Sequence, residues 1–141
     1  MIREALGDGS AFGLKVTYVD EGTELRGTGG AVRLAFDRGV LAEKFLITYG
    51  DSYLPIDFGA VWKAFLARPE AALMTVYRND ELFDASNVIF DAAGGKVALY
   101  QKGLKPKPEG MRWIDYGLLA IRRDEVARGI PQGEKTDLSV L

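Results

Sequence analysis

The feature that most constrains the fold is a sequence of two apolar stretches separated by an amphipathic one, between residues 44 and 78. The first, KFLITYGD, is nearly continuously apolar up to its glycine, which is typical of a strand buried on both faces. The middle one, IDFGAVWKAFLARPE, carries apolar residues on one helical face, with Asp57 placed to cap the helix. The last, AALMTVYR, is again typical of a buried strand. This alternation predicts βαβ units and a parallel sheet.

The rest of the chain extends this prediction. MIREAL at the start and AVRLAFDRG after Gly30 predict short helices, and LKVTYVDE (14–21) alternates as a half-buried strand does. SNVIFDAAGGKVALYQK predicts a hairpin, and RWIDYGLLAIRR predicts a strand that leads into a helix at DEVARG. We therefore expect a single α/β domain over 1–141, a three-layer sandwich with a mixed, mainly parallel sheet to which antiparallel strands are added.

Composition excludes several classes of site. The chain has 141 residues, no cysteine and no histidine, so thiolate and imidazole chemistry are excluded and any metal must be held by oxygen atoms. A formal charge of −2 offers no basic surface for nucleic acid. No apolar run reaches the roughly 20 residues of a membrane span, and no signal peptide is recognisable. We expect a cytoplasmic protein without nucleic-acid or membrane partners.

Asp51 is the first candidate for chemistry because it follows a buried strand directly. In doubly wound sheets, ligands bind beyond the carboxyl ends of the strands. A carboxylate there can hold Mg²⁺ together with phosphate oxygens. The alternative is that Asp51 only stabilises a turn.

Several other positions have both a binding and a structural interpretation. The glycines of RGTGGAV (26–32) could let backbone N–H groups approach a nucleotide, or could form a tight turn. Lys102 could neutralise a sugar phosphate or belong to a solvated lysine cluster, and Asn87 could bind sugar hydroxyls or close a local turn. Asp115 and Tyr116 lie beside Gly117, which could leave room for a pocket floor. The aromatic residues of this segment could equally be core.

In the order YVDEGTELRGTGGAVRLA, FLITYGDSYL, SNVIFD, YQKG and WIDYGLLAIRR, the chain resembles the sugar-phosphate nucleotidyltransferases, the pyrophosphorylases that make nucleotide sugars. The resemblance implies a Rossmann-like nucleotide-diphospho-sugar transferase fold. It also implies a reaction in which a nucleoside triphosphate and a sugar 1-phosphate give a nucleotide sugar and pyrophosphate.

The resemblance implies a role for each candidate position. Asp51 would bind the catalytic Mg²⁺, and Lys102 would act with it on the phosphates. The nucleoside would lie against Leu25, Gly27, Thr28, Gly29 and Gly30. The sugar phosphate would contact Asn87, Lys102, Asp115, Tyr116 and Gly117.

Three departures from the family's pattern bear on activity. The resemblance implies that one of them is the C-terminal region in which family members supply a second metal-binding carboxylate, which we expect this chain to lack. The family's glycine-rich GxGxRL loop and its downstream lysine have no match here, and its Glu-Lys pair appears as Gln101-Lys102. We therefore expect a truncated domain, with a non-catalytic remnant that binds sugar phosphate or nucleotide, or only self-associates, as the alternative. Exposed strand edges in such a domain favour a homodimer or another homo-oligomer.

Overall fold

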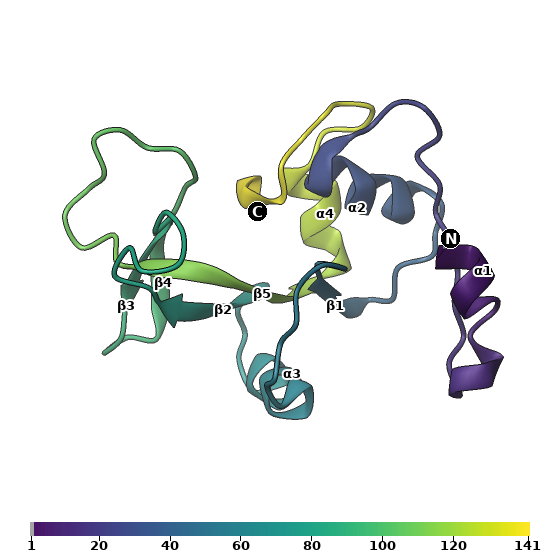
Figure 1. The fold of residues 1–141 in the computed structure, drawn as a ribbon, viewed down its shortest axis with the longest axis horizontal. Coiled ribbons are helices and arrows are strands. Elements are labelled where there is room, and N and C mark those ends of the chain that lie inside the picture. Colours follow the sequence, from purple (N-terminus) through teal and green to yellow (C-terminus); the bar gives the residue numbers. More distant parts are fainter. Residues whose placement is uncertain (1) are drawn as a thin grey trace. The chain divides into compact units, whose positions relative to one another are not determined.

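A computed structural model describes residues 2–141, which form two compact units (Figure 1). One unit comprises the residues up to Leu41 together with Val126–Leu141, and the other comprises Ala42–Glu125. We refer to them as the helical unit and the sheet unit. The expectation of a single partial domain over 1–141 stays a prediction.

The helical unit contains helix α1 (Ile2–Leu6), the 3₁₀ helix η1 (Ser10–Phe12), helix α2 (Gly27–Asp37) and the 3₁₀ helix η2 (Leu138–Val140). The sheet unit contains strands β1 (Lys44–Thr48), β2 (Ala72–Arg78), β3 (Val88–Asp91), β4 (Lys96–Tyr100) and β5 (Trp113–Arg122), with helix α3 (Phe58–Leu66). Helix α4 (Arg123–Gly129) continues directly from β5 and spans the boundary between the units.

All strand pairings in the sheet are antiparallel, so the prediction of a mainly parallel sheet is wrong. The strand order is β1-β5-β3-β4, and β2 also pairs with β5. Because β1 and β2 both run antiparallel to β5, they run in the same direction as each other. The predicted strand–helix–strand order is therefore present, but β5 lies between the two strands and pairs with both. The three-layer arrangement stays a prediction.

Helix α3 forms where the amphipathic pattern predicts it. The side chain of Asp57 caps it by accepting a hydrogen bond from the N–H of Ala60 at 3.0 Å, which satisfies one of the unpaired donors of the first turn. Phe65 is 1% exposed, and the helix contacts β2 and β5. The guanidinium of Arg122, on β5, lies 5.9 Å from the centre of the Phe65 ring. This helix therefore covers part of one face of the sheet (Figure 1).

The predicted hairpin and long strand are also present. β3 and β4 pair through a turn at residues 92–95, and Val88 pairs with both Tyr100 and Trp113. The ring of Phe90 meets that of Trp113 edge-on at 5.1 Å, a favourable aromatic geometry. The most deeply buried apolar side chains of the sheet unit are Phe65, Val88, Leu118, Ala120 and Ile121.

The helical unit departs from the sequence prediction at one segment. Residues 14–21 form no strand, because two of their backbone N–H groups close local turns: Leu14 bonds to Gly9 at 3.0 Å, and Val16 bonds to Asp8 at 2.8 Å. Helix α2 begins at Gly27, four residues before the predicted start, and ends at Asp37, with Gly39 at φ 67° just beyond its C-cap as predicted. Among the described residues, no helix is both long enough and apolar enough to cross a membrane.

Candidate functional site

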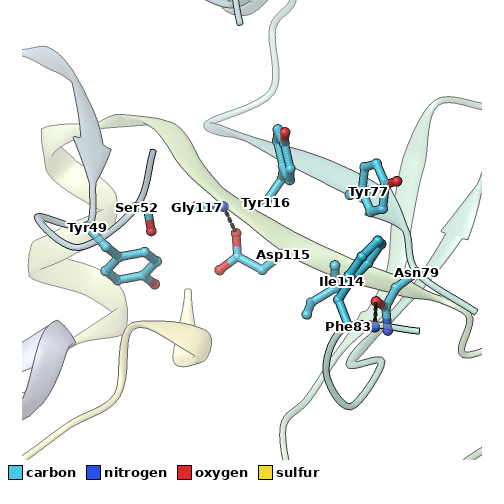
Figure 2. A pocket seen from close by; sticks show the side chains of 9 residues that line it. All are labelled: Tyr49, Ser52, Tyr77, Asn79, Phe83, Ile114, Asp115, Tyr116 and Gly117. Carbon is cyan, nitrogen blue, oxygen red and sulfur yellow. Dashed lines mark hydrogen bonds between the residues drawn. The ribbon is translucent and has the colours of Figure 1, made fainter. Parts of the chain in front are cut away.

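The sheet unit contains a cavity of about 430 Å³ where the turn after β1, the end of β2 and the middle of β5 meet (Figure 2). This volume is in the range of small-molecule sites. Three residues predicted to contact a sugar phosphate, Asp115, Tyr116 and Gly117, line it. The other lining residues are Tyr49, Ser52, Tyr77, Asn79, Phe83 and Ile114.

The segment that follows Asp115, residues 116–118, is a bulge in β5. The pairing with β2 shifts between Met74 and Val76, so two extra residues of β5 are accommodated there. Gly117 has φ +89°, a conformation that favours glycine, and its N–H donates to Oδ1 of Asp115 at 2.8 Å. The sequence DYG thus encodes this turn locally. Bulges redirect side chains out of the regular strand pattern, and this one lies at the cavity.

Asp115 is also held from neighbouring strands. Its backbone N–H donates to Oδ1 of Asn87 at 3.1 Å, and its Oδ2 accepts from the hydroxyl of Tyr100 at 3.0 Å. The ammonium group of Lys102 lies 6.0 Å from the centre of the Tyr100 ring. The sheet therefore brings Asn87 and Tyr100, which are separate from Asp115 in the sequence, into contact with it, and Lys102 lies near the Tyr100 ring. Sequence reasoning missed Tyr100.

Asp51 occupies the turn that follows β1. The N–H of Ser52 donates to the carbonyl of Tyr49 at 3.2 Å, which closes a tight turn around Gly50 and Asp51. Asp51 is exposed at this turn, whereas Tyr49 and Ser52 on either side line the cavity. A Cβ placed on Gly117 would meet Oγ of Ser52 at 3.3 Å, so the bulge and the turn are in close contact.

Three aromatic rings form one wall of the cavity, which we call the aromatic wall: Tyr77, Phe83 and Tyr116 (Figure 2). Tyr77 and Tyr116 stack with ring centres 5.4 Å apart, and Phe83 lies 6.0 Å from Tyr77. Sequence reasoning missed Tyr77 and Phe83. The signal that could have found Phe83 is an apolar pair, Leu82-Phe83, within the polar stretch RNDELFDAS.

The loop that carries Phe83 is fixed by Asn79, a fully buried side chain. Its Nδ2 donates to the carbonyl of Asp84 at 2.6 Å and to Oγ of Ser86 at 3.1 Å. Its Oδ1 accepts from the N–H of Phe83 at 3.1 Å, as Figure 2 shows. A buried amide with its donors and acceptor satisfied in this way gives the loop a defined backbone.

A second contact fixes the same loop at Glu81. This carboxylate bonds to the ammonium group of Lys107 and accepts from the N–H of Ser86 at 3.1 Å. Lys107, and after it Ser86, lower the pKa of Glu81 below its ordinary value of 4.5. The contact connects residues 79–86 to the proline-rich loop at 103–110.

The positions predicted to bind a nucleoside lie in the helical unit. Leu25 is 73% exposed before α2, and Thr28 accepts a bond at its Oγ1 from the N–H of Leu138 at 2.9 Å. The N–H groups of Gly29 and Gly30 both donate to the carbonyl of Thr136, at 2.9 and 3.2 Å.

Backbone atoms of residues 134–137 occupy the space around these glycines. A Cβ on Gly27 would lie 2.6 Å from the carbonyl oxygen of Thr136, and one on Gly29 would lie 2.9 Å from that of Asp137. The structure thus gives the glycines a packing role, because they let residues 134–138 approach the start of α2. Their predicted contact with a nucleoside stays a prediction.

The oxygen atoms near the cavity fit the expected Mg²⁺ only as part of its coordination. Mg²⁺ is commonly bound through one or two carboxylates, with the remaining positions filled by phosphate and water oxygens. Within residues 2–141, no group of three or more acidic side chains forms a site that protein atoms alone could complete. Asp51 is exposed beside the cavity and suits the role of a single protein ligand to an ion carried by phosphates.

Comparison with known proteins supports the resemblance seen in the sequence. No family model matches the chain. The N-acetylmuramate alpha-1-phosphate uridylyltransferase of Neisseria meningitidis serogroup B (strain ATCC BAA-335 / MC58) is 27% identical over 138 residues, which are 98% of this chain and 57% of that protein. The chain therefore spans a little over half the length of the curated relative it matches.

Solved structures show the same fold. HddC from Yersinia pseudotuberculosis matches with a TM-score of 0.69 and 20% identity, over 98% of this chain and 57% of its own, and has also been solved in complex with GMP-PN. The inositol-1-phosphate CTP transferase from T. maritima matches with a TM-score of 0.70 and 18% identity, over 98% of this chain and 54% of its own. The fold is therefore a nucleotidyltransferase fold, and the expected resemblance is confirmed.

Proposed function

Because the chain resembles the sugar-phosphate nucleotidyltransferases over nearly its whole length, we propose that it takes part in nucleotidyl transfer from a nucleoside triphosphate to a sugar 1-phosphate. In that reaction a phosphate oxygen of the sugar phosphate attacks the α-phosphorus of the nucleotide. A new P–O bond forms, the bond to the β-phosphate breaks, and pyrophosphate leaves. The products are a nucleotide sugar and pyrophosphate.

The observation that carries this proposal is that three of the predicted sugar-side residues, Asp115, Tyr116 and Gly117, line one cavity. Asn87 bonds to the backbone of Asp115, and Tyr100 connects Asp115 to the vicinity of Lys102. Asn87 and Lys102 do not themselves line the cavity, and Lys102 is exposed. A local turn at Asn87 would not require its contact with Asp115, so this contact supports a binding role for the pair.

Each residue would have a defined task in this reaction. Asp115 accepts hydrogen bonds from sugar hydroxyls, and Asn87 fixes its position. Lys102 offsets the charge of the sugar phosphate, and Asp51 is the protein ligand of Mg²⁺. The ion, when bound, neutralises charge on the phosphates. The nucleoside would bind at Leu25 and Gly27–Gly30, in the helical unit.

The proposed substrates, location and oligomeric state are those expected from the sequence. The partners of the reaction are a nucleoside triphosphate and a sugar 1-phosphate, in keeping with the GMP-PN complex of HddC and with the substrate named for the Neisseria relative. A cytoplasmic location and a homodimer remain part of the proposal.

One observation favours a second candidate, a domain that binds sugar phosphate or nucleotide without catalysis. The N–H groups of Gly29 and Gly30, which could hold a nucleotide, already bond to Thr136. The carbonyl of Thr136 therefore competes with any phosphate or ribose oxygen for these two N–H donors.

Pyrophosphate release decides between the two candidates. The assay pairs each nucleoside triphosphate with a panel of sugar 1-phosphates in the presence of Mg²⁺. The first candidate predicts release for one pairing and a loss of about 100-fold in Asp51→Ala. Asp124→Ala removes another exposed carboxylate, on α4, and is expected to leave the rate unchanged. No release under any pairing favours binding without catalysis.

A further inference from the structure

Phe83 combines high exposure with a fixed backbone. Its side chain is 76% exposed, although its N–H is bonded to the buried amide of Asn79 and its loop is tied to Lys107 through Glu81. With Leu82 and Tyr77, which are also exposed, Phe83 forms an apolar patch of the kind that marks binding sites. Because the loop is already ordered, covering the ring costs little conformational entropy.

Phe83 is also part of the aromatic wall, which gives the cavity an apolar side. Tyr77, which stacks on Tyr116, is itself 42% exposed. Ring faces and edges of this kind pack against the C–H groups of a cyclic ligand.

Asp115 gives the cavity a polar, negatively charged side, because it is the only charged residue among the nine that line the cavity. Its two oxygens accept bonds from Gly117 and Tyr100, and a carboxylate has about four acceptor sites, so it can also accept from ligand hydroxyls. Among those nine residues, none is a lysine or an arginine that could balance a second negative charge.

We propose that this cavity selects a sugar whose ring carries no charge, with its C–H face on the aromatic wall and its hydroxyls toward Asp115. The inference deepens the proposed function and rests on it for the identification of the ligand as a sugar 1-phosphate. A carboxylate on the ring would lie near Asp115 in a partly dehydrated site and be repelled. The ligand of this chain therefore differs in charge from N-acetylmuramate, the acid named for the Neisseria relative.

The test compares two ligands that differ at one carbon atom. Glucose 1-phosphate and glucuronic acid 1-phosphate share ring and phosphate, but the second carries a carboxylate in place of a CH₂OH group. Each ligand is titrated into the full chain at pH 7, and NMR spectra recorded at each step give its affinity. We expect the acid to bind at least about tenfold more weakly.

Variants separate the contributions of charge and aromatic contact. Asp115→Asn keeps an oxygen for Gly117 and is expected to reduce the discrimination to below about threefold. Phe83→Ala is expected to lower the affinity for glucose 1-phosphate by about three- to tenfold. Leu82→Ala is the matched control, since Leu82 is also 76% exposed in the same loop but does not line the cavity, and should change affinity less than twofold, a difference of about 0.4 kcal/mol.

Four results would overturn the inference. Equal affinity for the two ligands, or equal effects of Phe83→Ala and Leu82→Ala, would show that the cavity does not discriminate as described. Absence of binding by either ligand at millimolar concentration would do the same. Pyrophosphate release, measured on the same preparation, reports separately on the proposed function, because release with an acidic sugar phosphate contradicts only the inference.

Discussion

Position 117 requires glycine for two reasons. Its φ of +89° is strained for any residue with a Cβ, and that atom would lie 3.3 Å from Oγ of Ser52. We expect Gly117→Ala to lower the free energy of unfolding by about 1–2 kcal/mol, measured by urea denaturation. Gly50→Ala is the control, because its Cβ would meet no atom within 4 Å and its φ is not positive. Equal losses in the two variants would contradict the argument.

Glu81 is expected to titrate below its ordinary pKa of 4.5, mainly because Lys107 stabilises its charged form. A carboxylate whose pKa is lowered by folding contributes stability above its ordinary pKa, and the contribution is lost as the pH falls through the lowered value. The order of the loop at 79–86 should therefore decrease in acid, below pH 4.5.

The NMR titration of the Glu81 carboxyl carbon measures this pKa directly. Lys107→Ala should raise the midpoint toward 4.5. Lys105→Ala removes another exposed lysine of the same segment and should leave it unchanged. A midpoint that does not respond to Lys107→Ala would show that Lys107 is not the cause.

At this scale the sequence pointed to Asp115 and Gly117 as candidates, but not to the contacts that connect them, and their role in binding stays a prediction. Glycine beside an acidic residue is a local signal, and it predicts a turn. Contacts of Asp115 with Tyr100 and Asn87 depend on which strands become neighbours. Such contacts cannot be obtained from spacing along the chain.

At the scale of elements, the cap of α3 gives a direct prediction. Asp57→Ala removes the acceptor for the N–H of Ala60 and should lower the free energy of unfolding by about 1 kcal/mol. Asp57→Ser retains an acceptor at this position and should recover most of the loss. Thermal unfolding followed by circular dichroism measures both. A serine variant as unstable as the alanine variant would indicate that the bond to Ala60 contributes little.

Most helices and strands were predictable because their hydrophobic periodicity is local. The hairpin of β3 and β4, the strand β5 and the helix α3 all follow such patterns. The direction of the sheet was not predictable, because β5 enters between β1 and β2 from later in the chain. The segment 14–21 has a strand pattern, yet the N–H groups of Leu14 and Val16 bond to carbonyls of residues that precede the segment in the chain, so local contacts overrode strand propensity.

At the scale of the whole molecule, the homo-oligomer expected from the sequence remains a prediction. Among the described strands, β4 pairs only with β3, and Val97 on β4 is 39% exposed. An unpaired edge of this kind can associate with another copy. Light scattering should therefore give the mass of a dimer, and Val97→Lys, which places a charge on that edge, should shift it toward the monomer.

The matched control replaces an exposed valine outside the sheet. Val140, in η2, is 53% exposed, and Val140→Lys should leave the mass unchanged. A monomeric wild-type chain at high concentration would contradict the prediction.

The order in which the strands pair also determines when the sheet can form during synthesis. β1, β2 and β3 leave the ribosome before β5, yet each of them pairs with it. The hairpin of β3 and β4 can close as soon as it emerges, whereas β1 and β2 remain without their partner until translation has passed residue 122. During that interval their apolar side chains are open to chaperones and to other nascent chains.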